Sequence, residues 1–408
     1  MKCRGCKSIL TRTFIDLGDS PIANNLLSAG QLREMEEVYP LHTRTCDCCG
    51  FVQLPEIFTR ETLFPKNYTY YSSYSTSWLT HSEKYAIEMI DKLALTATDL
   101  VVEVASNDGY LLQYFRIRGV PVLGIEPVSE VARVAVEERG ISTIVEFFGE
   151  EVAKRLVQDY KKPRLMIANN VLAHVPDIHD FVAGFKTLLD DEGVITFEFP
   201  HLLNLILLNQ FDTIYHEHYS YLSLTALKPI FASHGLRIFD VVELNTHGGS
   251  LRVFVCKTDS SWRESVTVQR CLESESAHDP RSEVVAARVQ ARSSQVKSDL
   301  LNELSKIKQR GLSIAAYGAA AKGNTLLNFV GVTSKIIDYV VDRNPHKQGK
   351  FLPGSHIPIV SEDHLRANPP DVLLILPWNL ATEVEEQLAY LKTQGVLFLR
   401  AIPSVEYF

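Results

Sequence analysis

The chain has 408 residues, which is enough for two or three domains that each bury a core. Its 46% hydrophobic and 22% charged residues are ordinary for a soluble globular protein, and a net charge of −8 excludes a broad basic surface for nucleic acid. The longest apolar run, 202–208, is too short to span a bilayer, and no signal peptide is visible. We therefore expect a cytoplasmic protein whose seven cysteines form no disulfide framework.

The first fifty residues carry two C-x-x-C pairs about forty residues apart. Each pair places two thiolates on one turn, and two such turns complete a tetrahedral Zn²⁺ site. The predicted ligands are Cys3, Cys6, Cys46 and Cys49, with Cys48 as a bystander. Four cysteines leave no open coordination position, so this zinc is expected to be structural. The alternative is a set of reduced structural thiols or a redox pair.

A tyrosine-rich stretch, 67–75, follows this head and mixes four tyrosines with several hydroxyl residues. A tyrosine ring with its hydroxyl tip suits contact with a sugar. The equally weighted alternative is a strip that packs between two domains.

The middle of the chain contains seven strand candidates. The first five alternate with helical patterns such as 128–139 and 149–159, so they should be parallel, and the last two are joined by a hairpin-like turn at 245–249. This is the layout that we expect of a class I methyltransferase; an NAD-binding Rossmann domain more often carries G-x-G-x-x-G, which the loop 105–109 does not match. The seven candidates lie near 100–104, 121–126, 142–145, 163–169, 193–199, 236–243 and 250–256.

A strand, a tight loop and a helix start follow one another at 101–112, which places backbone N–H groups at the carboxyl edge of the sheet. An acidic residue at the end of the next strand can accept hydrogen bonds from both hydroxyls of a ribose. A nucleoside-containing cofactor is therefore expected here, although two surface carboxylates would give the same pattern. The candidate cofactor ligands are Glu103, Ala105, Asn107, Asp108, Gly109, Glu126, Asn169 and Asn170.

The densest cluster of titratable groups is the segment 215–221, which reads Tyr-His-Glu-His-Tyr-Ser-Tyr. If the segment is extended, Glu217 points away from both histidines; if it is a helical turn, Tyr215 and His218 share a face. General acid–base chemistry is the favoured interpretation. A catalytic metal site lacks the H-E-x-x-H spacing, and a solvated polar turn is the plain alternative. His174 follows the fourth strand and is either within reach of the substrate or a structural hydrogen-bonding group.

After a charged helical connector, with its clearest helical pattern at 284–307, a smaller α/β domain closes the chain, with strands near 313–317, 336–342 and 371–376. The loop at 318–325 resembles a P-loop, but Asn324 stands where the P-loop lysine belongs. It is predicted to be a cradle for the diphosphate of a bound nucleotide, with a plain strand–helix turn as the alternative. The candidate substrate ligands are Lys322, Asn324, Asp342, Asn344, Lys347, Trp378 and Asn379.

Taken together, the two C-x-x-C pairs, the loop at 106–109, the segment 215–219, the motif at 247–252 and the loop at 317–325 resemble the S-adenosylmethionine (SAM)-dependent C-methyltransferases that act on nucleotide-linked 4-keto-deoxysugars. The resemblance covers essentially the whole chain. It implies a zinc-binding domain at 1–75, a SAM-binding methyltransferase domain at 76–258, and a C-terminal α/β domain at 259–408 that helps to bind the nucleotide sugar. One departure is Ala105, where a glycine usually opens the cofactor loop.

By this resemblance, five residues match active-site positions, with His218 as the base: Tyr70, His174, Tyr215, Glu217 and His218. The expected reaction is C-methylation at C-3′ of a dTDP- or GDP-linked 4-keto-deoxysugar, because a ketone at C4 acidifies the C3 proton. Tyr215 would stabilise the enolate and Glu217 would orient the imidazole. No nucleic acid or membrane partner is expected, and the chain is expected to act as a monomer. The alternatives are a non-catalytic regulator that binds SAM or nucleotide sugar and an O- or N-methyltransferase.

Overall fold

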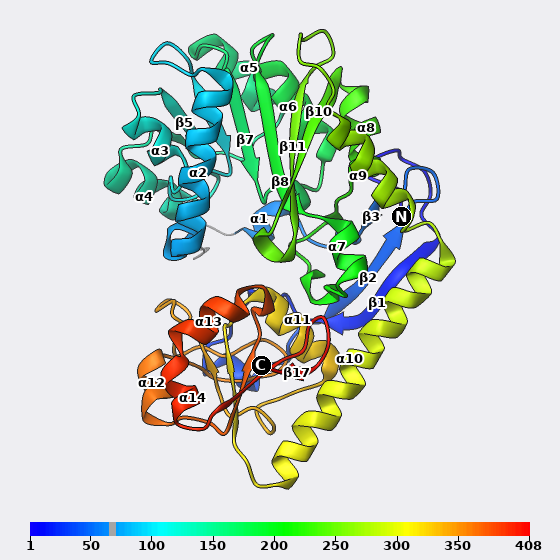
Figure 1. The fold of residues 1–408 in the computed structure, drawn as a ribbon, viewed down its shortest axis with the longest axis vertical. Helices are drawn as coiled ribbons and strands as arrows, with labels where there is room; N and C mark the ends of the chain where they lie inside the picture. The colour runs from blue at the N-terminus through cyan, green and yellow to red at the C-terminus, as the bar shows by residue number, and fades with distance from the viewer. Residues whose placement is uncertain (65–70) are drawn as a thin grey trace.

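The computed structural model describes residues 1–64 and 71–408. Within them the chain forms sheets of four, seven and six strands. Figure 1 shows two α/β lobes, and the long helix α10 (Glu283–Gln309) runs along one side of the molecule from the upper lobe to the lower.

The seven-stranded sheet has the order β10-β11-β8-β7-β4-β5-β6, and its first five strands along the chain are parallel. Central strands such as β4 are buried on both faces, which explains their unbroken runs of apolar residues. The predicted class I methyltransferase fold is confirmed. The strands are β4 (Val101–Val104), β5 (Val122–Ile125), β6 (Thr143–Ile144), β7 (Leu165–Asn169), β8 (Val194–Pro200), β10 (Leu236–Leu244) and β11 (Ser250–Lys257).

Helices connect these strands, and apolar side chains of most of them pack in the two cores beside the sheet, whereas Leu202, Leu205 and Ile206 join the core of the C-terminal sheet. The helix α2 precedes the first strand, and its N-terminus follows directly on the short helix η2 (Ser72–Tyr74). The helices are α2 (Thr76–Leu93), α3 (Leu112–Ile117), α4 (Ser129–Arg139), α5 (Glu150–Asp159), α6 (Ile178–Leu188), α7 (Leu202–Leu207) and α8 (Leu224–Ser233).

The four-stranded sheet belongs mostly to the N-terminal head, in the order β1-β2-β3-β9. Its last strand, however, comes from the middle of the chain and pairs with β3 through Val52–Tyr221 and Gln53–Ser220. The head therefore holds the end of the segment 215–221, an arrangement that the sequence did not predict. The elements are β1 (Arg12–Ser20), β2 (Tyr39–Thr45), β3 (Val52–Gln53), α1 (Arg60–Leu63) and β9 (Ser220–Tyr221).

The C-terminal sheet has the order β14-β13-β12-β15-β16-β17, and its first five strands in that order are parallel. One apolar core joins this sheet to α10 and to Phe14 and Ile15 of β1, so the head and the tail share buried contacts. The strands are β12 (Ile314–Tyr317), β13 (Val340–Val341), β14 (Ile359–Val360), β15 (Val372–Ile375), β16 (Leu397–Arg400) and β17 (Glu406–Tyr407). The remaining helices are α9 (Val266–Ser276), α11 (Ala321–Val330), α12 (Glu362–Ala367), α13 (Ala381–Gln387) and α14 (Ala389–Thr393).

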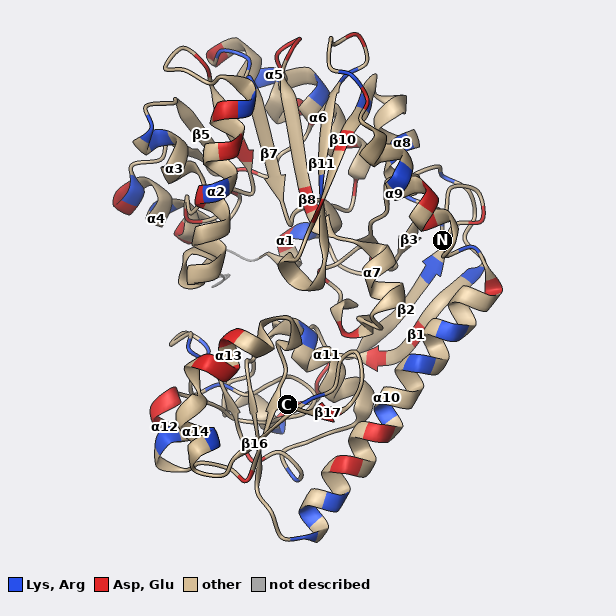
Figure 2. Ribbon diagram, in the orientation of Figure 1, with Lys and Arg blue, Asp and Glu red and all other residues tan. Residues whose placement is uncertain are grey.

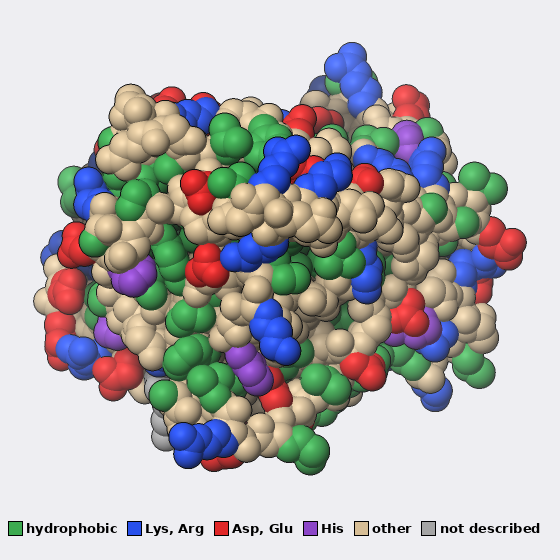
Figure 3. Space-filling view, turned by 90° about the horizontal axis from the view of Figure 1, so that it is seen from below, with side chains coloured by type: hydrophobic (Ala, Val, Ile, Leu, Met, Phe, Trp, Pro, Cys, Tyr) green, Lys and Arg blue, Asp and Glu red, His purple; other side chains and the backbone are tan. Residues whose placement is uncertain are grey.

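Charge is mixed over the molecule rather than gathered in one region. Both basic and acidic residues lie along α10 in Figure 2, and both signs are interspersed on the face seen in Figure 3. Among the described helices, none is both long enough and apolar enough to cross a membrane.

Candidate active site and zinc centre

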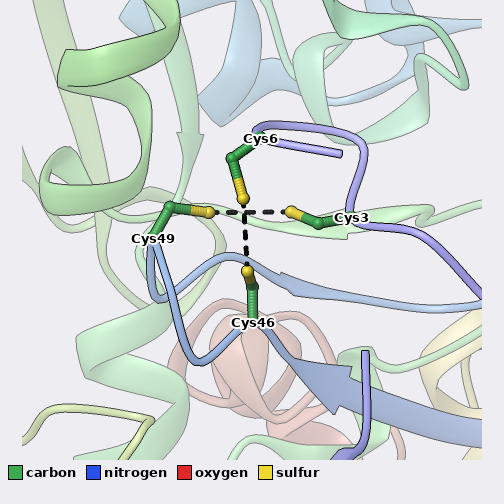
Figure 4. Close-up of side chains that lie close together, drawn as sticks. All are labelled: Cys3, Cys6, Cys46 and Cys49. Carbon is green, nitrogen blue, oxygen red and sulfur yellow. Dashed lines mark hydrogen bonds between the residues drawn. The ribbon is translucent and has the colours of Figure 1, made fainter. Parts of the chain in front are cut away.

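The four cysteines of the head converge on one point. Figure 4 shows their sulfur atoms directed inward from two turns, with Sγ–Sγ distances of 3.6 Å between Cys3 and Cys49 and 3.4 Å between Cys6 and Cys46. A Zn²⁺ ion with four sulfur ligands at 2.3 Å requires sulfur pairs about 3.8 Å apart, so the cluster fits a tetrahedral zinc ion. Gln53 also donates a hydrogen bond from Nε2 to Cys3 Sγ at 3.3 Å, the kind of outer contact that supports a bound thiolate.

The cofactor loop leaves β4 at the carboxyl edge of the sheet, between β5 and β7. Glu126, which follows β5, accepts the Asn107 N–H at 3.0 Å and the Val128 N–H at 2.9 Å, and each oxygen keeps a lone pair for a ribose hydroxyl. Burial raises the pKa of Glu126 to about 7. The loop is covered by residues that precede α2, where Ser72 N–H donates to Asn107 at 2.8 Å and Ser73 donates to Asp108.

Several buried acceptors beside this loop have no hydrogen-bond partner within the described protein. They belong to the loop and to the ends of β4 and β7, and they are Glu103 Oε1 and Oε2, Asp108 Oδ1, Asn169 Oδ1 and Asn170 Oδ1. Burial raises the pKa of Glu103 well above its ordinary value, an effect that the Tyr110 side chain partly offsets. Glu103 is fully buried inside β4, which excludes the alternative that it is a surface carboxylate. Such a set of unsatisfied acceptors fits the hydroxyls and ammonium of SAM.

The residue that departs from the family pattern, Ala105, has φ +58° and so lies in the left-handed region. This conformation costs a residue with a Cβ atom about 1 kcal/mol or more, which glycine avoids.

We therefore expect Ala105→Gly to raise the free energy of unfolding by up to about 1 kcal/mol, measured by urea denaturation, with little change in SAM affinity. The opposite kind of substitution at another position of the same loop, Gly109→Ala, serves as the comparison. Gly109 has φ +76°, and an added Cβ would lie 3.1 Å from Ile141, so this variant should be less stable. A loss of stability in Ala105→Gly would mean that the Ala105 methyl makes a packing contact worth more than its backbone strain.

The segment 215–218 is a turn rather than an extended strand, because His218 N–H donates to Tyr215 O at 2.9 Å. The Tyr215 hydroxyl lies 2.8 Å from His218 Nε2, and His218 Nδ1 lies 2.8 Å from the Thr213 carbonyl oxygen. A carbonyl oxygen only accepts, so Nδ1 carries the proton and the lone pair of Nε2 accepts from Tyr215. The protein thus fixes a neutral imidazole in one tautomer.

Burial and a second histidine keep this imidazole unprotonated. His174 packs edge-to-face on His218 with ring centroids 4.7 Å apart, and its Nδ1 donates to the Glu217 carbonyl oxygen at 2.7 Å. Burial lowers the pKa of His218 well below 6.5, with a further contribution from His174, and burial also lowers the pKa of His174 to about 4. Both rings remain half-buried and reachable, whereas a solvated polar turn would show neither burial nor such shifts.

The sequence predicted that Glu217 orients the His218 imidazole, and this prediction is wrong. The Glu217 carboxylate is buried and accepts from Asn24 Nδ2 at 2.9 Å, and the Thr213 carbonyl orients His218 instead. Side chains of neighbouring residues in the turn diverge, so Glu217 faces the N-terminal head. His216 also faces the head and lies 3.2 Å from the Tyr39 carbonyl oxygen through Nε2.

The C-terminal domain brings one lysine to this site. Lys322 Nζ donates to Asn379 at 2.7 Å and lies 4.9 Å from the centroid of the Trp378 ring. Trp378 Nε1 donates to the Asp212 carboxylate at 2.7 Å, and Asp212 immediately precedes Thr213 in the sequence. Burial raises the pKa of Asp212 to about 7, and the pKa values of both His218 and His247 are lowered in part by the charge of Lys322. Lys322 therefore lies in the electrostatic neighbourhood of the imidazole pair.

The other tail candidates lie around the same loop in different roles. Asp342 accepts the Ala319 N–H at 2.9 Å and the Asn344 N–H at 2.9 Å, and Lys347 donates to the Ala319 carbonyl at 2.8 Å. These contacts tie the loop together internally. Asn324 is fully buried and both of its side-chain polar atoms lack partners within the described protein.

Sequence reasoning missed several groups that the fold brings to the site. Thr213 acts through its backbone, and Asp212 and Asn24 had no recognisable motif. His247 lies in the hairpin-like turn at 245–249. Asn170 Nδ2 lies 3.3 Å from its Nε2, and the Trp78 ring packs against it with centroids 5.1 Å apart. Tyr70 lies outside the described residues, but its neighbour Tyr71 packs against Tyr74 at 5.4 Å and His346 at 6.2 Å between ring centroids.

The chain is similar to known protein families in three successive stretches. Three family models match: a zinc binding domain at residues 3–64, a methyltransferase domain at 78–241 and a C-methyltransferase C-terminal domain at 245–403. The C-methyltransferase NovU of Streptomyces niveus is 34% identical over 99% of this chain and 96% of its own length.

Two solved structures align with the chain only in part. Magnesium protoporphyrin IX methyltransferase (ChlM) from Synechocystis PCC 6803 with bound SAH is 14% identical, covers 44% of this chain and 83% of its own, and has a TM-score of 0.35. The YcgJ protein of Bacillus is 13% identical, covers 46% of this chain and 100% of its own, and also has a TM-score of 0.35.

The seven-stranded sheet, its cofactor loop and the matched methyltransferase domain define a class I SAM-dependent methyltransferase. A structural zinc site in the head accompanies it. On the full-length identity to NovU, the chain belongs to the C-methyltransferase family.

Proposed function

We propose that this enzyme methylates carbon C-3′ of a nucleotide-linked 4-keto-deoxysugar. The observation that supports it most is the neutral His218 imidazole, fixed by Thr213 and Tyr215 in a half-buried turn. Carbon is a poor nucleophile unless a neighbouring carbonyl acidifies its proton, so a C-methyltransferase for a ketone needs a base at this place.

In this reaction His218 Nε2 takes the proton from the carbon next to the ketone, and the electron pair of that C–H bond moves into an enolate. For this step the Tyr215 hydroxyl, which donates to Nε2 at 2.8 Å, turns to the enolate oxygen, so that the Nε2 lone pair is free to take the proton. The cofactor supplies an electrophilic methyl group on a sulfonium. The enolate carbon forms the new C–C bond with the methyl group while the methyl–sulfur bond breaks, its electron pair stays on sulfur and SAH is left. The ketone is restored, and His218 keeps the proton until it passes to solvent.

Electrostatics support an anionic substrate at the same place. Lys322 is a half-buried cation beside the imidazoles. It belongs to the first turn of α11, whose N-terminus has no side-chain cap, so backbone N–H groups and the helix dipole remain available for a diphosphate. Asn324, with two unsatisfied polar atoms, lies in the same turn. These features support a nucleoside diphosphate as the handle of the sugar.

The test uses SAM labelled with ¹³C in its methyl group and dTDP- or GDP-linked 4-keto-6-deoxyhexoses. We expect a ¹³C methyl signal attached to carbon, with solvent deuterium exchange at C3 when SAH replaces SAM. A methyl signal on oxygen or nitrogen would contradict C-methylation of this substrate. Binding of both ligands by calorimetry without turnover or exchange would favour a regulator.

A further inference from the structure

The segment that carries His218 is anchored by the zinc-binding head. Beyond the pairing of β3 with β9, Leu54 N–H donates to the Tyr219 carbonyl oxygen at 3.0 Å. The Tyr219 hydroxyl donates to the Phe58 carbonyl at 2.8 Å. The residue immediately after the imidazole is thus bonded to the head through both its backbone and its side chain.

The strongest of these anchors is Arg4, which lies between two zinc-ligand cysteines in the sequence. Its buried guanidinium donates from Nη1 to the Tyr219 carbonyl at 2.7 Å and from Nη2 to the Leu54 carbonyl at 2.5 Å. It also lies 5.3 Å from the centroid of the Tyr219 ring. A planar fork that bridges two carbonyls fixes their separation, which a lysine ammonium cannot reproduce.

Arg4 is itself held by the zinc centre. Its backbone N–H donates to Gln53 Oε1 at 2.9 Å, while Gln53 Nε2 donates to Cys3 Sγ at 3.3 Å. Gln53 is fully buried and its backbone pairs with Ser220. A short series of hydrogen bonds therefore links the predicted zinc ligand Cys3, through Gln53 and Arg4, to Tyr219, the residue that follows His218.

We propose that Arg4 is a positioning residue for the reaction: it holds the Tyr219 carbonyl so that the preceding imidazole keeps its bonds to Thr213 and Tyr215. Arg4 touches neither the substrate nor the cofactor; it acts through the backbone of the turn. The zinc-bound head thereby sets the alignment of the base. This inference rests on the proposed role of His218 as that base.

The physical reason is the sensitivity of proton abstraction to geometry. A displacement of about 1 Å at the reacting groups can cost about 10²-fold in rate. Removing the fork takes one donor from each carbonyl: the Leu54 carbonyl loses the Arg4 bond, and the Tyr219 carbonyl keeps only the Leu54 N–H, so the turn would relax. A role in head stability alone would instead change zinc retention and unfolding without a selective effect on turnover.

The test compares Arg4→Met, which keeps the length of the side chain, with Arg4→Lys and with Arg12→Met as a control. Arg12 is a second arginine of the head, bonded to Asp47 at 2.5 Å and to Glu283 at 3.2 Å, away from the turn. For each protein we would measure zinc content, SAH affinity, kcat and KM. The proton on His218 Nδ1 is followed by NMR and assigned by its loss in His218→Gln.

We expect Arg4→Met to retain zinc and SAH binding while kcat falls about 10- to 100-fold and the Nδ1 proton resonance shifts or broadens. Arg4→Lys should restore part of the rate, and Arg12→Met should match the wild type. If Arg4→Met does not fold, Arg4→Lys carries the test, with a kcat about 3- to 10-fold below wild type expected from the lost fork.

An unchanged kcat and an unchanged Nδ1 resonance in a folded Arg4 variant would overturn the proposal, as would equal losses in Arg12→Met. Failure of the wild type to exchange or methylate the 4-keto sugar would instead refute the proposed substrate. The NMR comparison does not depend on substrate, so the two failures are distinguishable.

Discussion

Replacing His218 by glutamine is expected to lower kcat by about 10²- to 10⁴-fold, the usual contribution of a general base. Glutamine approximates the size of the ring and can still donate to the Thr213 carbonyl, but it has no basic lone pair for Tyr215. SAH affinity should stay unchanged, because the candidate cofactor ligands lie on β4, β5 and β7. The measurement is steady-state kinetics combined with deuterium exchange at the acidic carbon.

The matched control is His216→Gln. His216 belongs to the same turn and is buried, and burial lowers its pKa to about 4, but its ring faces Tyr39 rather than the imidazole pair. This variant should lose far less activity. If His218→Gln retained more than about a tenth of wild-type kcat, the role of His218 as base would be refuted.

The pH profile gives a second check on His218. Because its pKa lies well below 6.5, the base is already neutral at pH 7, and protonation begins only in more acidic solution. The kcat should therefore stay level as pH falls through 6.5, the ordinary histidine value, and decline only in more acidic solution. A decline centred on the ordinary histidine pKa would indicate an exposed imidazole.

Replacing Glu103 by glutamine is expected to weaken SAM binding by about 10- to 100-fold and, at the same time, to stabilise the cofactor-free protein. Both carboxylate oxygens are buried, and the Tyr110 side chain offsets only part of the cost of burial, so charge at this position is costly until a cationic ligand arrives. The raised pKa shows that the native state holds the proton more tightly than the unfolded chain. Stability is therefore lost as pH rises above the ordinary value of 4.5, and the amide removes that loss.

Calorimetric titration with SAM and thermal unfolding of the cofactor-free protein at pH 7 measure the two effects. Glu138→Gln, an exposed carboxylate on α4, serves as the control and should change neither. A Glu103→Gln protein that was less stable without cofactor would show that the carboxylate makes a structural bond. Unchanged SAM affinity would remove Glu103 from the cofactor site.

The sequence predicted the elements whose signal is local. The apolar β-branched run of β4 and the 27-residue helical pattern of α10 were recognisable because burial on both faces and amphipathic periodicity are written in adjacent residues. The helical-turn option for Tyr215 and His218 also followed from their spacing, and it holds in the structure. The paired C-x-x-C motifs predicted the zinc ligands for the same reason.

Features that depend on contacts between distant segments were not predictable. Glu217 was expected to orient His218, but the chain direction turns its carboxylate toward Asn24. The loop at 318–325 resembled a P-loop, yet its last residue, Thr325, donates to the Ile214 carbonyl at 3.1 Å, next to the turn at 215–218. A backbone carbonyl such as that of Thr213 has no sequence signal at all.

The strand β9 has a consequence for how the protein is made. Arg4 and Tyr219 are 215 residues apart, so a ribosome must deliver more than half of the chain before the head can close its sheet. Until then the nascent head exposes the unpaired edge of β3, a surface prone to pairing with other chains. Contacts of such long separation also slow folding. We therefore expect the nascent head to be able to bind metal early and to gain its final strand, together with the turn at 215–218, only late in synthesis.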